Sequence, residues 1–278
     1  MVKLKSYAKI NLCLYVLKKR EDGYHEIFTV MQAIELCDEI FLSKISKGIK
    51  IECDDPEVPA NSSNLAYKSA KFLLNEAKID SGVKIRIKKK IPVGSGLGGG
   101  SSNAAFTLMG LNRLFDLKFT RKKLHRIAEK VGSDVPFFLY SGQAVARGRG
   151  EKIKEIKLPK DYWIVLVKPN FKILTPNIYK KIKIDLTKER KKIKISFKKE
   201  GFFALLKKWR NDLEGEVEKI FPQIEEIKDS LQEIGAIKVS MSGSGPTVYG
   251  IFEKKPKNKE VKKSFRGDWQ IFMTRPIP

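Results

Sequence analysis

Apolar and polar residues alternate along several short stretches of the first 90 residues, which is typical of half-buried strands. The alternation predicts strands at residues 3–7, 11–17, 33–42, 48–53 and 83–87, with a break between the first two at Ala8-Lys9-Ile10. Residues 64–77 instead place apolar side chains at helical spacing, with Asn64 or Ser63 as the cap. The first third of the chain therefore mixes strands with a helix.

The later pattern predicts more helices and a second group of strands. Helical periodicity covers residues 104–115 and, after a Thr120 cap, 121–131; a hairpin is predicted at 142–146 and 152–156. A strand at 162–167 is followed by helices at 177–182, 202–210, 213–221 and 222–234. The chain then ends with strands at 236–241 and 247–252, a helix at 257–265 and a strand at 269–273. This order predicts an α+β chain with a ferredoxin-like second half.

A boundary is expected at Leu158-Pro159-Lys160, where a polar stretch with proline separates the hairpin from the next strand. It divides the chain into domains 1–158 and 159–278. The basic segment 183–199 is expected to be an excursion from the second domain.

The strand at 83–87 leads into I-P-V-G-S-G-L-G-G-G-S-S-N at residues 91–103, directly before a helix. Glycine lets the backbone approach a ligand with no Cβ in the way. A helix N-terminus adds unpaired N–H groups and the positive end of the helix dipole, which suit a phosphate. A flexible linker is the alternative, but the close frame of strand and helix favours an anion site. A second glycine-serine turn follows at residues 242–246.

The chain of 278 residues carries 56 Lys and Arg against 32 Asp and Glu, a formal net charge of +24. This charge favours an anionic ligand, and nucleic acid has to be considered. The basic runs are spread over the chain, which indicates mostly solvated surface, and Lys- and Glu-rich faces also suit a protein working at high temperature. A hydrophobic content of 42% excludes a disordered chain.

The three cysteines form no C-x-x-C pair, and only two histidines are present. A zinc cluster is therefore not expected, and the odd number of thiols favours a reducing cytoplasm. No secretory signal and no bilayer-length apolar run are found, so we expect no membrane association.

Some single residues allow two interpretations before any comparison. Lys9 lies in an apolar strand environment and is either an edge lysine reaching solvent or a directed charge. Asp134 either caps a short helix started by Pro136 or offers a carboxylate near the phosphate loop. Tyr24, beside His25 in a polar loop, either stacks on a planar ring or covers apolar surface.

Three stretches together carry a family resemblance: Y-A-K-I-N-L at 7–12, P-V-G-S-G-L-G-G-G-S-S-N at 92–103 and S-G-S-G-P-T-V-Y-G at 242–250. The chain resembles the kinase superfamily named for galactokinase, homoserine kinase, mevalonate kinase and phosphomevalonate kinase. D-G-Y-H at 22–25 and G-S-D-V-P-F at 132–137 resemble, within it, the 4-diphosphocytidyl-2-C-methyl-D-erythritol kinases of non-mevalonate isoprenoid synthesis. The resemblance covers nearly the whole chain and is weakest at 183–210. It implies an N-terminal domain like ribosomal protein S5 domain 2, a ferredoxin-like C-terminal domain and a site in the cleft between them.

The resemblance implies transfer of the γ-phosphoryl group of ATP to the 2-hydroxyl of the cytidyl substrate. Asp134 is the implied base, because this tertiary hydroxyl is poorly acidic, and Lys9 is implied to lie beside it and keep it ionised. The implied ATP-binding residues are Pro92, Val93, Gly94, Ser95, Gly96, Leu97, Gly98, Gly99, Gly100, Ser101 and Ser102, with Gly243, Ser244 and Gly245 on the other side. No Walker sequence is present.

The same resemblance implies that Tyr24 and Tyr179 enclose the cytosine ring while His25 hydrogen-bonds its polar edge, and that Asn11 orients the substrate hydroxyls. Mg²⁺ is expected with ATP. Many relatives carry serines where this chain has Gly99 and Gly100, so the protein ligands of the metal stay unassigned.

Two alternatives remain. Another kinase of the superfamily, acting on homoserine or mevalonate, needs no ring-binding Tyr24-His25 pair. An RNA-binding protein would suit the +24 charge, but it leaves Lys9, Asp134 and both glycine stretches without a shared purpose. We therefore expect no nucleic-acid partner; the sequence does not indicate an oligomeric state.

Overall fold

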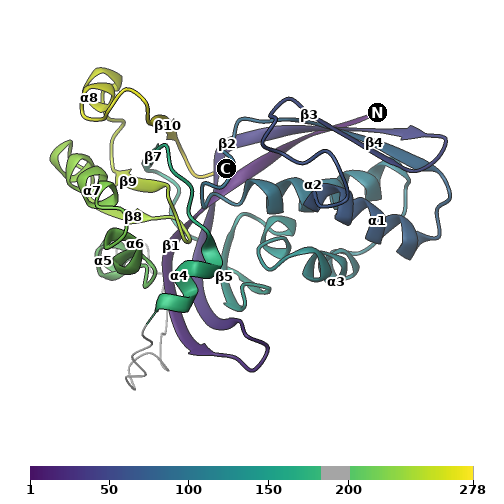
Figure 1. Cartoon of the computed structure of the whole chain (residues 1–278), viewed down its shortest axis with the longest axis horizontal. Helices are drawn as coiled ribbons and strands as arrows, with labels where there is room; N and C mark the ends of the chain where they lie inside the picture. The colour runs from purple at the N-terminus through teal and green to yellow at the C-terminus, as the bar shows by residue number, and fades with distance from the viewer. Residues whose placement is uncertain (183–200, 278) are drawn as a thin grey trace. The chain divides into compact units, whose positions relative to one another are not determined.

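The computed structural model describes residues 1–182 and 201–277 and divides the chain into two compact units (Figure 1). Unit 1 comprises Met1–Ala8, Leu36–Val93 and Gly98–Ser141; unit 2 comprises Lys9–Glu35, Gly94–Leu97 and Gly142–Pro278. The predicted basic excursion, residues 183–199, lies outside the described residues. The division into domains 1–158 and 159–278 stays a prediction.

Two long strands contribute to both units: β1 (Val2–Lys19) and β2 (His25–Ile45). The predicted break at Ala8-Lys9-Ile10 is wrong, because β1 continues through all three residues. Each of them is buried, and the lysine finds hydrogen-bond acceptors, so it does not interrupt the strand. β2 likewise begins at His25, eight residues before the predicted start.

In unit 1, β3 (Ile49–Cys53) pairs parallel with β4 (Gly82–Lys88), and β4 pairs antiparallel with the second half of β2. The helices are α1 (Leu65–Ala77), α2 (Gly99–Leu114), α3 (Arg121–Val131) and the short 3₁₀ helix η1 (Pro136–Leu139). Asn64 and Thr120 cap α1 and α3 as predicted. α1 and α2 pack along each other (Figure 1), and the start of α2 receives the glycine stretch.

In unit 2, the first half of β2 pairs with β5 (Gln143–Gly148), which forms the predicted hairpin with β6 (Lys152–Glu155). A separate four-stranded sheet has the order β10-β7-β9-β8. Its strands are β7 (Trp163–Lys168), β8 (Lys238–Met241), β9 (Val248–Phe252) and β10 (Gln270–Thr274). Numbered along the chain, this is the order 4-1-3-2 of a ferredoxin-like sheet, as the sequence predicted.

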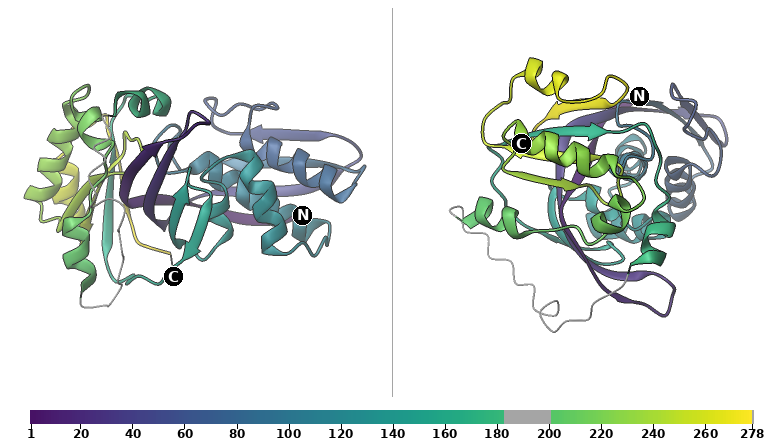
Figure 2. Two further views of the ribbon diagram at one scale, coloured as in Figure 1. Left: turned by 90° about the horizontal axis from the view of Figure 1, so that it is seen from below. Right: turned by 60° about the vertical axis from the view of Figure 1, so that its left-hand side comes forward.

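The helices of unit 2 are α4 (Thr175–Lys181), α5 (Phe202–Lys208), α6 (Glu214–Glu218), α7 (Gln223–Glu233) and α8 (Asn258–Lys263) (Figure 2). Ile224, Ile227 and Leu231 recur at helical spacing on α7 and are fully buried against the sheet core that includes Met241 and Val248. The predicted α+β class is confirmed. No helix in the described part of the chain combines the length and apolarity needed to cross a membrane.

Candidate active site

Lys9 lies in the middle of β1, where its side chain is only 3% exposed. Its Nζ donates to Asn11 Oδ1 at 2.6 Å and to the carbonyl oxygen of Gly96 at 2.9 Å. Residues two apart on a strand share a face, so Lys9 and Asn11 point the same way. The edge-lysine interpretation is wrong, because a buried ammonium depends on such acceptors rather than on solvent.

Asn11 is itself held on three sides. Its Nδ2 donates to Thr29 Oγ1 at 2.8 Å, and that hydroxyl donates to the carbonyl of Cys13 at 2.6 Å. The phenolic hydroxyl of Tyr249 donates to the Asn11 carbonyl at 2.9 Å. These contacts leave the amide oxygen facing Lys9. Thr29 and Tyr249 support the site but carry no motif, so sequence analysis did not find them.

The part of the glycine stretch in unit 2, Gly94–Leu97, is bound to the strand and to the second glycine-serine turn. The Lys9 N–H donates to the Leu97 carbonyl at 2.9 Å, and Ser242 Oγ donates to the Gly96 carbonyl at 3.0 Å. Gly96 has φ of 77°, and a Cβ there would lie 2.2 Å from the Ser242 carbonyl oxygen. Glycine is therefore required at Gly96 by both conformation and contact.

The second turn, residues 242–246, approaches the same ammonium. A Cβ on Gly243 would lie 3.4 Å from both Lys9 Nζ and Asn11 Oδ1. Asn211 fixes this turn from behind, since its Nδ2 donates to the carbonyls of Met241 at 2.9 Å and Gly243 at 2.7 Å. Unit 2 thus brings Lys9, Asn11 and parts of both glycine stretches together. Asn211 was missed, because a lone asparagine between helices gives no sequence signal.

The aromatic residues predicted to bind a ring lie around the start of β2. The rings of His25 and Tyr179 are 5.2 Å apart and tilted by 31°. Tyr24 is 54% exposed, and the Arg149 guanidinium lies 4.9 Å from its ring centroid. The observed ring pair is thus His25 with Tyr179, while Tyr24 contacts Arg149. Partial burial, and to a smaller extent Lys19, lowers the pKa of His25 below its ordinary 6.5.

Helix α4 connects this aromatic group to the second turn. Tyr179 lies on α4, and Thr175 at the start of the same helix shares a 2.6 Å hydrogen bond between hydroxyl groups with Ser244. The two predicted binding regions of unit 2 are therefore linked through one helix.

The remaining part of the glycine stretch belongs to unit 1. Gly99, Gly100, Ser101 and Ser102 are the first residues of α2, whereas the sequence predicted its start at residue 104. First-turn N–H groups lack an intrahelical partner, and the first turn of α2 contains no acidic residue. The Ser102 hydroxyl is fully buried and lies 2.7 Å from Ser6 Oγ, which ties it to the interior of unit 1.

A buried carboxylate, Asp38, holds both sides of this segment. β2 and β4 separate after their Glu39–Lys88 pair, and Asp38 accepts hydrogen bonds from the freed N–H groups of Lys90 at 2.7 Å and Ile91 at 2.8 Å. It also forms an ion pair with Lys89 and accepts from Asn103 Nδ2 at 2.9 Å. Asp38 thereby connects the end of β4 to the first turns of α2. No sequence motif contains Asp38, so the sequence analysis did not select it.

Asp134 is a half-buried residue of unit 1 in the turn between α3 and η1. The N-cap position of η1 is Val135, so the interpretation of Asp134 as the cap is wrong. Its pairing with Lys9 stays a prediction. Among residues 1–182 and 201–277, no group of three or more His, Cys, Asp and Glu side chains is placed to hold a metal ion.

Comparisons with known proteins agree with the motifs. The family model of the GHMP kinases N terminal domain matches residues 64–142, and that of the GHMP kinases C terminal matches residues 199–270. A 4-diphosphocytidyl-2-C-methyl-D-erythritol kinase of Syntrophus aciditrophicus (strain SB) is 43% identical over 100% of both chains. The kinase of the same name from Thermodesulfovibrio yellowstonii is 43% identical over 97% of this chain and 96% of its own.

Solved structures extend the likeness. A crystal structure of 4-(cytidine 5'-diphospho)-2C-methyl-D-erythritol kinase matches with a TM-score of 0.81 and 31% identity over 100% of both chains. The mevalonate kinase of Methanococcus jannaschii matches with a TM-score of 0.75 over 100% of this chain and 98% of its own. Because the two sequences are only 18% identical, this match shows a shared fold and nothing more.

Replacing Gly96 by alanine is expected to destabilise the protein by at least about 2 kcal/mol, from left-handed strain plus displacement of the backbone at Ser242. Gly94→Ala is the matched control. Gly94 has a similar φ of 64°, but no atom lies within 4 Å of a Cβ there, so only strain of about 1 kcal/mol is expected. Denaturant unfolding of both variants measures the difference; equal losses would show that the two turns do not need to touch.

Proposed function

The chain belongs to the 4-diphosphocytidyl-2-C-methyl-D-erythritol kinases among the GHMP kinases, and from this we propose that it phosphorylates the 2-hydroxyl of 4-diphosphocytidyl-2-C-methyl-D-erythritol with ATP. The products are the 2-phosphate and ADP, in the non-mevalonate route to isoprenoid precursors. The observation that carries the proposal is the buried ammonium of Lys9, held between Asn11 and Gly96. A fixed positive charge beside two glycine turns suits a reaction that moves a phosphoryl group.

ATP is the phosphoryl donor, and the glycine stretch offers the surface for its phosphates. Within the segment from Pro92 to Ser102, residues that follow the proline supply backbone N–H groups, together with the N-terminal end of α2, where an anion is stabilised. Gly243, Ser244 and Gly245 supply the opposite side. In unit 2 the two turns are joined by the hydrogen bond from Ser242 to Gly96, which supports a shared task.

Asp134 is the proposed general base. The transferred group carries spread negative charge, so catalysis depends on positioning and on complementary positive charge. The accepting hydroxyl must lose its proton as the new bond to phosphorus forms, and a carboxylate takes it up. Lys9 compensates the charge on the reacting oxygens, and Asn11 orients the hydroxyls of the substrate.

The cytidine end of the substrate is assigned to Tyr24, His25 and Tyr179. A neutral imidazole offers one donor and one acceptor, which suits the mixed polar edge of cytosine. The lowered pKa of His25 favours this neutral form. The 5.2 Å separation of the His25 and Tyr179 rings supports a common role for them at one aromatic surface.

Mg²⁺ is proposed to enter with ATP, neutralising phosphate charge. Magnesium in such sites is held largely by substrate phosphates and water, with one or two carboxylates from the protein. Ser102 does not suit a ligand role, because its hydroxyl is buried on Ser6; the protein ligands are left unassigned. The three free thiols, Cys13, Cys37 and Cys53, support placing the reaction in the cytoplasm.

ADP release is expected with 4-diphosphocytidyl-2-C-methyl-D-erythritol and not with mevalonate or homoserine. A polar site built for a base leaves groups unpaired when the base is missing, so kcat/KM should differ by roughly 10³-fold or more. A coupled assay with the three substrates at equal ATP measures this. Comparable turnover of mevalonate or homoserine would contradict the assignment.

Asp134→Ala is expected to lower kcat by about 10² to 10⁴-fold, the usual contribution of a general base. The dissociation constant of ATP should stay within about threefold, because the proposed role concerns the acceptor. Asp134→Asn, which keeps the shape and removes the charge, should be equally impaired. A variant that retains most of its kcat would disprove the assignment of the base.

The KM for the cytidyl substrate is expected to be constant above pH 7 and to rise as the pH falls below 6.5. Protonation turns the His25 acceptor into a second donor, and the lowered pKa keeps the ring neutral until the pH is below its ordinary range. Initial rates between pH 5 and 8 measure this. His25→Gln should have a raised KM without that pH dependence, and an unchanged profile in this variant would contradict the role of His25.

A further inference from the structure

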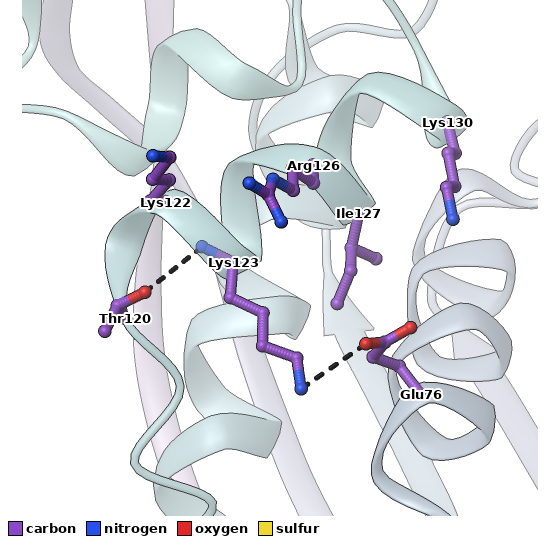
Figure 3. A pocket seen from close by; sticks show the side chains of 7 residues that line it. All are labelled: Glu76, Thr120, Lys122, Lys123, Arg126, Ile127 and Lys130. Atoms are coloured by element: carbon purple, nitrogen blue, oxygen red, sulfur yellow. Dashed lines mark hydrogen bonds and ion pairs between the residues drawn. The ribbon is translucent and has the colours of Figure 1, made fainter.

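Unit 1 contains a hollow of about 490 Å³ (Figure 3). None of the residues that line it has a role in the proposed reaction. It lies between α3 and the end of α1, and we call it the α3 pocket. Four cationic side chains line it, with one carboxylate, Glu76, from α1 (Figure 3); the cations are Lys122, Lys123, Arg126 and Lys130. Its volume is within the range of small-molecule sites.

The charges of the α3 pocket are not balanced within the fold. Lys122, Arg126 and Lys130 follow one another at four-residue spacing and are all exposed, so neighbouring members repel. None of the three makes an ion pair with a residue that the structure describes. Lys123 is the exception, with its Nζ 3.3 Å from Glu76.

Some cations elsewhere in the fold are paired within it. Lys228, a half-buried residue of α7, pairs with both Glu214 and Glu218. The first turn of α7 contains Glu225 and Glu226, which suit the positive end of the helix dipole. The first turn of α3 has no acidic residue. Like charges at four-residue spacing on one helix destabilise it slightly, and a bound anion relieves that repulsion.

We propose that the α3 pocket binds a small anion carrying two or more phosphate groups, at a site separate from the glycine stretches. Lysine ammonium groups act as point charges toward phosphate, and the planar guanidinium of Arg126 can donate two parallel hydrogen bonds to one phosphate. The concave shape and the apolar wall given by Ile127 favour a compact ligand over an extended nucleic acid strand.

Inorganic triphosphate is the probe, titrated calorimetrically at physiological ionic strength with no nucleotide present, because ADP carries two phosphate groups and would compete at the α3 pocket. Besides any binding at the glycine stretches, we expect one saturable site in the unaltered chain that depends on α3. Its affinity should fall about tenfold in the combined variant Lys122→Ala, Arg126→Ala, Lys130→Ala, since three partly exposed charge contacts are lost. Removing mutually repelling residues should not lower the melting temperature, so the variant is expected to fold.

The matched control removes equal charge from α8, with Lys259, Lys262 and Lys263, all exposed, changed to alanine. It should bind triphosphate as the unaltered chain does. Equal weakening in both variants would mean that net charge alone attracts the anion. Saturable binding that the α3 variant does not weaken, or no saturable binding, would equally overturn the proposal. Tighter, α3-dependent binding of a single-stranded RNA would instead identify a nucleic-acid surface. This test does not depend on the kinase assignment, because it compares the triphosphate affinities of the α3 and α8 variants and not their kinase activity.

Discussion

The buried ammonium of Lys9 is the constraint on which the arrangement in unit 2 depends. A charge with 3% exposure is costly to bury unless acceptors surround it. Those acceptors come from the same strand, at Asn11, and from the glycine stretch, at Gly96. Satisfying one charge therefore fixes the position of a turn that lies 87 residues away in sequence. The chemistry proposed for Lys9 uses the charge that this packing has already oriented.

A second buried charge performs the corresponding task in unit 1. Asp38 is fully buried, and four donors converge on it: Lys89, two backbone N–H groups and Asn103. Asp38 hydrogen-bonds Lys90 and Ile91, which connect β4 to the glycine stretch. It also hydrogen-bonds Asn103 on α2, the helix into which the glycine stretch leads. Lys9 and Asp38 thus each anchor a different part of the glycine stretch, each within its own unit.

The sequence predicted the structure correctly where a residue type strongly favours one local conformation. Glycines at 94, 96 and 243 with positive φ, the Asn64 and Thr120 caps and the ferredoxin-like order of elements followed from local pattern. The break predicted at Lys9 was wrong, because a polar residue in an apolar run looks the same whether it ends a strand or is solvated by distant acceptors. Asp38, Asn211 and Thr29 were missed for the same reason: their partners are set by tertiary contacts, between 16 and 65 residues away along the chain.

Buried and exposed charges in this chain differ in how far their partners can be inferred. A charge in the interior must be paired, so Lys9 and Asp38 each define their neighbours once burial is known. The +24 balance has to be carried on the surface, where solvent tolerates an unpaired cation. A binding role for surface cations can therefore be inferred only from their spacing and from the shape of the surface around them. On α3, three cations with no ion-pair partner among the described residues line one hollow that contains a single carboxylate. That distinction explains why composition alone suggested anionic partners in general, whereas individual sites emerged only from the fold.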